Sequence, residues 1–80
     1  MANKEYIDVL VLIDKEGKKR PLGLIWKDGR RFLIGRILDV CPAASLKAGG
    51  AGIRYTCEVN GKATFLFDEE GKWFVEGRSS

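Results

Sequence analysis

The chain of 80 residues contains no histidine and only two cysteines, Cys41 and Cys57. It therefore lacks the commonest metal ligand and the commonest general base at neutral pH. The cysteine spacing fits no zinc motif, and nothing else in the sequence points to an oxidising compartment, so we expect two free thiols. These absences exclude most catalytic templates, and we predict no catalytic residue, no metal site and no cofactor.

Long apolar segments are also missing. The longest uninterrupted apolar run, Val9 to Ile13, is far too short to cross a bilayer. Asp8 and Asp14 bracket this run, which argues against a secretory signal peptide. With 45% hydrophobic and 31% charged residues the composition is that of a globular protein. We expect a cytoplasmic protein with no membrane partner.

What the chain does contain is a series of apolar segments separated by short turns that end in glycine. A chain of this length supports one core, so we expect a single domain over residues 1–80, with frayed tails at 1–4 and 77–80. The segments predict six strands, which cover Tyr6 to Asp14, Lys19 to Trp26, Arg31 to Val40, Ile53 to Val59, Lys62 to Asp68 and Lys72 to Glu76. Pro42 to Ala48, followed by Gly49, has the signature of a short helical turn over residues 42–48.

The third strand is apolar on both faces, with Gly35 in its middle. A flat sheet would expose one of those faces, so this pattern favours a strand that bends at Gly35 and joins two orthogonally packed layers. Because consecutive strands are linked by hairpins, the predicted fold is all-β. It is a six-stranded antiparallel meander that forms a small, SH3-like barrel or roll.

The turns predict the register of the strands. Lys27-Asp28-Gly29 lies between two apolar runs, and Asp-Gly in such a position is a strong hairpin signal. If every loop has three residues and ends in a glycine of positive φ, the flanking residues face each other, as Asp14/Lys18, Trp26/Arg30, Glu58/Lys62 and Asp68/Lys72. The same register sets Cys57 opposite Ala63, Tyr55 opposite Phe65, Ile53 opposite Phe67, Phe67 opposite Trp73, and Thr56 opposite Thr64.

A two-residue Asn60-Gly61 loop is the alternative for the hairpin after Val59. The three-residue loop is preferred, because the shorter one would place Phe65 and Phe67 on the face of Arg54 and Thr56 and break a clean alternation. The predicted core face then consists of Ile53, Tyr55, Phe65, Phe67, Trp73 and Val75.

Positive charge is concentrated in residues 15–36, which hold eight Lys or Arg against two acidic residues. Lys18, Lys62 and Lys72 are explained as partners of acidic residues across the turns. The other basic residues, together with a half-buried Trp26, are candidates for sequence-nonspecific contact with nucleic acid, namely Lys19, Arg20, Trp26, Lys27, Arg30, Arg31 and Arg36. The alternative is that they form a solvated, solubilising face.

Other polar features favour plain structural roles. The Gly49-Gly50-Ala51-Gly52 stretch lacks the Lys-Ser/Thr continuation of a phosphate-binding loop and is expected to be a flexible connection. The acidic run Asp68 to Glu70 has no ligand spacing for a cation. Ser45 has no partner base, Cys57 alternates inward as a small hydrophobe, and Cys41 is expected near the surface.

The run from Ile25 to Phe32, followed by Ile37-Leu38-Asp39, Tyr55 to Val59 and a closing Gly-Lys-Trp-Phe-Val-Glu, resembles a family of short uncharacterised bacterial β-domains. The shared pattern is Trp-x-Gly-Arg-Arg-aromatic, then Leu-Asp, then Gly-x-Trp-Phe, over residues 21–76. The resemblance implies an association of some members with translesion-polymerase-like proteins and no catalytic residues. This chain departs from the family at Ala43 to Lys47, where members often carry tryptophans.

Together these observations favour a non-enzymatic binding or accessory domain whose partner is unknown. One hypothesis is weak nucleic-acid contact through a basic hairpin face. The other is a protein–protein interaction or structural module, including a homodimer formed through a strand edge. Basic residues that converge beside an exposed aromatic side chain would favour the first hypothesis. An exposed apolar patch would favour the second.

Overall fold

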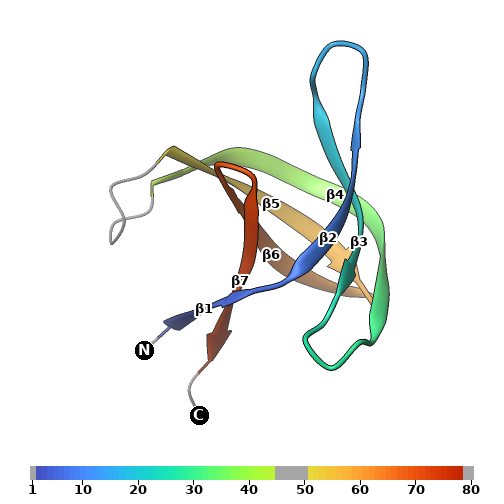
Figure 1. Ribbon diagram of the computed structural model, residues 1–80, viewed down its shortest axis with the longest axis vertical. Coiled ribbons are helices and arrows are strands. Elements are labelled where there is room, and N and C mark those ends of the chain that lie inside the picture. The colour runs from blue at the N-terminus through green and yellow to red at the C-terminus, as the bar shows by residue number, and fades with distance from the viewer. Residues whose placement is uncertain (1, 45–50, 79–80) are drawn as a thin grey trace.

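The computed structural model describes residues 2–44 and 51–78. They form seven strands, which are β1 (Ala2–Tyr6), β2 (Asp8–Ile13), β3 (Lys19–Ile25), β4 (Arg31–Ala44), β5 (Ala51–Val59), β6 (Lys62–Glu69) and β7 (Lys72–Arg78). All pairings are antiparallel, in the order β1-β7-β6-β5-β4-β3-β2. The sheet curls strongly into an open half-barrel (Figure 1). The all-β class and the meander are confirmed.

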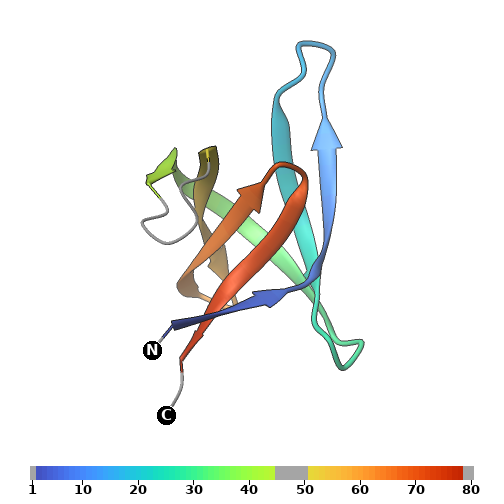
Figure 2. The same cartoon turned by 60° about the vertical axis from the view of Figure 1, so that its left-hand side comes forward.

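The two ends of the chain differ from the expectation of frayed tails. Residues 2–6 form β1 and pair with the end of β7, and Gly77 and Arg78 belong to that strand. β1 leads directly into β2, and between them Ile7 donates its backbone N–H to the Trp73 carbonyl oxygen at 3.0 Å. β1 and β2 follow each other in the chain but lie at opposite ends of the strand order. Their direct connection therefore requires the sheet to curl (Figure 2).

β4 is the longest strand and carries the predicted irregularity at Gly35. The β4–β5 register shifts between Ile34 and Arg36, and again between Ile37 and Asp39. Such bulges bend a strand and increase its twist, so β4 curves through the sheet (Figure 1). One curled sheet replaces the two orthogonal layers that we expected. The predicted helical turn is wrong for residues 42–44, which continue β4, while residues 45–48 lie outside the described part.

The first two hairpins confirm the three-residue loops. Gly17 and Gly29 have φ of +85° and +90°. Asp14 donates its N–H to the Lys18 carbonyl at 3.0 Å, and Trp26 donates to the Arg30 carbonyl at 2.8 Å. The predicted facing positions Asp14/Lys18 and Trp26/Arg30 are therefore correct.

The last two hairpins contradict the three-residue prediction. Asn60 and Gly61 both have positive φ, +52° and +76°, and so do Glu70 and Gly71, +52° and +89°. Two consecutive residues of positive φ make the two-residue turn whose twist matches that of antiparallel strands. Val59 therefore pairs with Lys62 and Glu69 with Lys72, which replaces the predicted Glu58/Lys62 and Asp68/Lys72 pairs.

This one-residue difference exchanges the two faces of β6, because side chains alternate along a strand. Tyr55 now lies opposite Leu66, not Phe65, and Phe67 lies opposite Arg54 and Phe74, not Ile53 and Trp73. The predicted Cys57/Ala63 and Thr56/Thr64 pairs are likewise replaced by Cys57/Thr64 and Thr56/Phe65.

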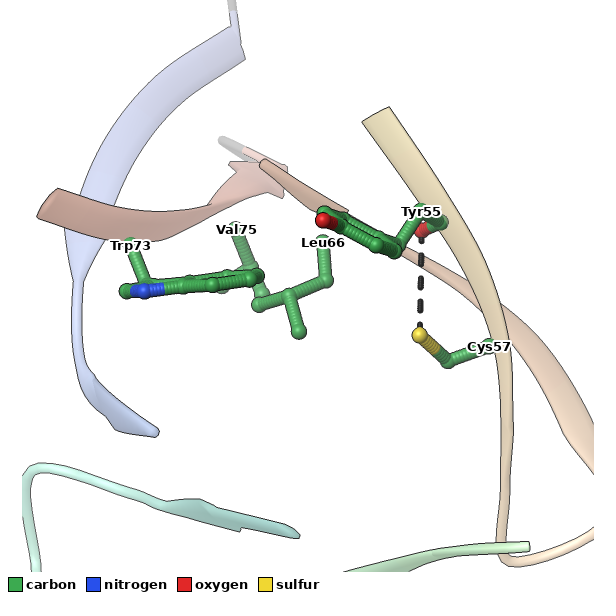
Figure 3. Packing of buried hydrophobic residues seen from close by; sticks show 5 residues of the cluster. All are labelled: Tyr55, Cys57, Leu66, Trp73 and Val75. Atoms are coloured by element: carbon green, nitrogen blue, oxygen red, sulfur yellow. Dashed lines mark hydrogen bonds between the residues drawn. The ribbon is translucent and has the colours of Figure 1, made fainter. Parts of the chain in front are cut away.

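The core lies on the inner face of the half-barrel. Its main cluster of buried side chains comes from β5, β6 and β7 (Figure 3) and consists of Tyr55, Cys57, Leu66, Trp73 and Val75. Leu66 has no exposed surface, and the rings of Tyr55 and Trp73 lie 5.3 Å apart. The core prediction is correct for Tyr55, Trp73 and Val75. It is wrong for Phe65 and Ile53, which are 49% and 40% exposed, and for Phe67, which lies on the outer face.

A second, smaller cluster covers the outer face of β1, β6 and β7. The Phe67 and Phe74 rings stack at 4.9 Å, and Tyr6 packs against Phe74 at 5.5 Å. Glu69 accepts hydrogen bonds from Lys4 Nζ and from the Tyr6 hydroxyl. These two donors lower the pKa of the Glu69 carboxyl.

Candidate binding cleft

The predicted nucleic-acid residues do not gather on one surface. Lys27 and Arg30 belong to the β3–β4 turn, where Lys27 pairs with Glu5 at 3.5 Å and Arg30 with Asp28 at 2.7 Å. The backbone N–H of Arg30 and its guanidinium both bind the Asp28 carboxyl, which lowers its pKa.

The other members of that set are dispersed as well. Trp26 is half-buried against the core, as expected, and cannot act as an exposed stacking platform. The Arg30 guanidinium lies over the Phe32 ring at 5.7 Å. Arg31 opens β4 opposite Ile25.

Lys19, Arg20 and Arg36, in contrast, line one cleft of about 780 Å³. The cleft lies where β3 and β4 diverge, since these strands pair only from Gly23↔Leu33 to Ile25↔Arg31. Beyond that point the β2–β3 hairpin projects away from the sheet (Figure 1). The cleft therefore follows from the strand topology and not from a loop.

The wall of the cleft is apolar and aliphatic. It is formed by side chains of β2, β3, β4 and β5, which are Leu12, Pro21, Leu22, Ile34, Ile37, Val40 and Tyr55. Tyr55 is almost fully buried, so no aromatic face is open to a ligand. Burial, and then the negative charge of Asp68, raise the pKa of its hydroxyl. Tyr55 is therefore a neutral structural residue.

Gly35 and five charged residues complete the lining, and the charged ones are four cations and one anion, namely Lys18, Lys19, Arg20, Arg36 and Asp14. The Asp14 carboxylate is occupied, since it accepts backbone N–H groups of Glu16 and Lys18 at 2.8 and 2.9 Å. No side-chain ion pair between Asp14 and Lys18 occurs in the described structure. The rim consequently keeps an excess of positive charge.

The Lys19–Asp68 ion pair spans the interior beside this cleft. Lys19 Nζ lies 3.1 Å from Asp68 Oδ2, and Asp68 is only 5% exposed. The other carboxylate oxygen, Oδ1, accepts the Gly71 N–H at 2.8 Å. One carboxylate therefore connects β3 to β6 and also holds the β6–β7 turn.

The strand edges at the cleft are poor templates for another strand. Pro21 offers no N–H, Leu22 lies at a register shift in the β2–β3 pair, and β4 carries its two bulges here. Proline and bulges are the usual means of protecting an exposed edge. A ligand would therefore contact side chains in the cleft more than backbone.

Sequence reasoning missed the cleft and its apolar wall. The sequence pattern assigns Lys18 to an ion pair across a turn. It assigns the aliphatic residues to strands but does not indicate that they line a common cleft. β3 and β4 separate on the side of Gly23 toward Lys19, and the sequence indicates this only through Pro21, which has no backbone N–H to donate to a neighbouring strand. Only the strand pairing of the folded protein shows which residues form the two sides of the cleft.

The acidic run, the two cysteines, Ser45 and the glycine stretch were the other features considered in the sequence. Asp68 and Glu69 are engaged by Lys19 and Lys4, and residues 2–44 and 51–78 contain no group of three or more potential metal ligands. Both cysteines are free, with Cys57 buried and Cys41 half-buried. Gly49, Gly50 and Ser45 lie outside the described residues, whereas Gly52 is part of β5.

No helix in the described part of the chain is long and apolar enough to cross a membrane. Comparisons of the sequence and fold with protein-family models, curated proteins and solved structures give no match. The resemblance to short bacterial β-domains therefore stays a prediction, and any functional conclusion for this chain rests on the geometry of the cleft.

Proposed function

We propose that this protein is a non-enzymatic binding module whose cleft between β3 and β4 takes an acidic, partly apolar segment of a protein partner. The observation that carries the proposal is the combination of an aliphatic wall with a cationic rim in a cleft of about 780 Å³. We further propose an SH3-like outline for the curled sheet. A cytoplasmic location is part of the same hypothesis.

The chemistry of the cleft favours a protein segment over nucleic acid. Single-stranded nucleic acid is usually held by exposed aromatic side chains that stack on bases. In this cleft the one aromatic residue, Tyr55, is buried, and the wall is otherwise aliphatic. Apolar side chains of a peptide would fill such a wall, while its carboxylates would meet Lys18, Arg20 and Arg36.

Nucleic acid is the second candidate, because of the excess of cations on the rim. Phosphate contacts alone would give weak, salt-sensitive binding without sequence preference. The two candidates differ in what they require from the wall. A peptide needs the aliphatic surface of Val40, whereas a phosphate backbone needs only the charges.

The test is a titration of the whole protein, by fluorescence anisotropy, with three labelled probes at low and physiological salt. The probes are a short peptide that alternates glutamate and valine, its lysine–valine counterpart, and oligo-thymidine. We expect only the acidic peptide to bind well. Arg36→Glu should weaken it by about tenfold, as for a lost ion pair of 1.4 kcal/mol, and Val40→Lys should also weaken it.

Two variants serve as matched controls. Lys62→Glu makes the same charge change on β6, and Leu38→Lys adds the same side chain at an exposed position of β4, but neither residue lines the cleft. Both should bind like the parent protein. Binding that is indifferent to Arg36→Glu and Val40→Lys would overturn the proposal. Oligo-thymidine binding that depends on Arg36 but not on Val40 would put the nucleic-acid function in its place.

A further inference from the structure

The outer face of the small sheet formed by β2, β3 and β4 carries two rows of side chains. In one row Leu10 and Leu33 flank Gly23, and in the next Asp8 and Arg31 flank Ile25. The alternate residues face the other way, since Val9 packs on the core and Leu24 is buried. We call the two rows the hairpin face, and none of their residues lines the cleft.

The hairpin face is unusually apolar for an exposed surface. Leu10 is 54% exposed and Leu33 is 81% exposed. Gly23 between them has no side chain and is itself buried, because an added Cβ would lie 3.2 Å from the Phe32 carbonyl oxygen and 3.8 Å from a methyl carbon of each leucine. The two leucines thus lean over Gly23 and form a continuous, exposed apolar patch, which favours contact with another protein surface.

The charges of the hairpin face have opposite signs at its two sides. Asp8 lies on β2 and Arg31 on β4, so about two strand spacings, roughly 10 Å, separate their backbones. Neither residue forms an ion pair with another described residue. Each charge is therefore available to a partner, and the side with Asp8 is complementary to the side with Arg31.

From this symmetry we propose that the hairpin face binds a second copy of this chain about a twofold axis parallel to β3. Such an axis exchanges β2 and β4 between the copies. It places Asp8 opposite the partner's Arg31 and Leu10 opposite the partner's Leu33, and each contact occurs twice. Gly23 of both copies lies at the axis, where the leucines that cover it meet those of the partner.

The size and the surroundings of the face set the strength of the contact. Two rows over three strands are much smaller than the roughly 800 Å² per partner of a typical stable interface. The β2–β3 register shifts just beyond Leu10, and Arg20 past that shift lines the cleft, so the regular face is limited to the two rows. The dimer is therefore weak, with a dissociation constant in the micromolar range or above.

Sedimentation of the full chain over a wide range of concentrations tests the proposal. The parent protein should pass from monomer to dimer. Leu33→Asp should weaken the dimer at least tenfold, and so should Asp8→Arg or Arg31→Asp alone. The double variant Asp8→Arg/Arg31→Asp should restore the dimer, because the exchange of signs leaves each contact complementary.

Glu16→Arg, in the β2–β3 turn, makes the same charge change as Asp8→Arg away from the hairpin face and should have no effect. All substituted side chains are exposed, and circular dichroism confirms that each variant is folded. A parent protein that stays monomeric at millimolar concentration would overturn the proposal. A dimer that is indifferent to Leu33→Asp, or one that the double variant fails to restore, would overturn it equally.

Discussion

The Lys19–Asp68 ion pair offers the most direct test of how this fold is held together. Lys19 Nζ and Asp68 Oδ2 are 3.1 Å apart and join residues 49 positions apart in the sequence. At an effective dielectric constant of about 20, two charges at this distance attract by roughly 5 kcal/mol. Desolvation of both groups opposes most of that attraction.

The exposure of the two partners decides the net effect. The Asp68 side chain is 5% exposed but that of Lys19 is 38% exposed, so solvent screens part of the interaction and the estimate must be lowered. Lys19→Met would leave a buried carboxylate without its counter-charge, at a cost of about 2–3 kcal/mol, below the 3–5 of a fully buried pair. That is a large fraction of the stability of a small domain.

A double-mutant cycle separates the ion pair from the other contact of Asp68. Asp68→Asn removes the charge but leaves an amide oxygen for the Gly71 N–H, whereas Asp68→Ala removes both and should cost about 1 kcal/mol more. Lys19→Met/Asp68→Asn has no unpaired charge and should be more stable than Lys19→Met alone. We expect a coupling energy of about 1–3 kcal/mol.

Urea denaturation followed by the fluorescence of Trp26 and Trp73 supplies the four free energies of unfolding. Lys18→Met is the control, because it removes the neighbouring lysine, which forms no ion pair with a described residue. This change should stay within about 0.5 kcal/mol of the parent. A coupling energy below about 0.3 kcal/mol, or a double variant no more stable than Lys19→Met, would refute the assigned role of the pair.

Four further outcomes are expected. Leu66→Ala should lower the free energy of unfolding by about 2–5 kcal/mol, whereas Phe65→Ala, on the outer face, should cost much less, and equal losses would mean that the faces of β6 are exchanged. Glu70→Gly should stabilise the protein by up to about 1 kcal/mol in the same assay, since Glu70 has a φ of +52°. Burial raises the pKa of the Cys57 thiol, so at pH 8 a thiol reagent should label half-buried Cys41 first and Cys57 only on unfolding. The same shift predicts that stability falls as pH rises above about 8.5, where the unfolded chain ionises this thiol before the folded one; a stability that rises there would contradict it.

The sequence by itself determined the all-β class, the meander and the positions of the turns. These features depend on local chemistry, namely apolar segments of strand length and glycines that allow positive φ. The loops closed by Gly17 and Gly29 were predicted for the same reason. The burial of Tyr55 and Cys57 was predicted from the alternation along β5, which the folded protein retains, and the burial of Trp73 was predicted as well.

Only the tertiary structure decided the register of the last two hairpins. Loops of two and three residues differ by a single position, yet that position decides whether Leu66 or Phe65 enters the core. At Glu70 the local cost of a positive φ is offset by the Asp68–Gly71 hydrogen bond and by Lys19 from a distant strand. The cleft and the hairpin face arise in the same way, because they depend on where β3 leaves β4, and that is set by the curl of the whole sheet.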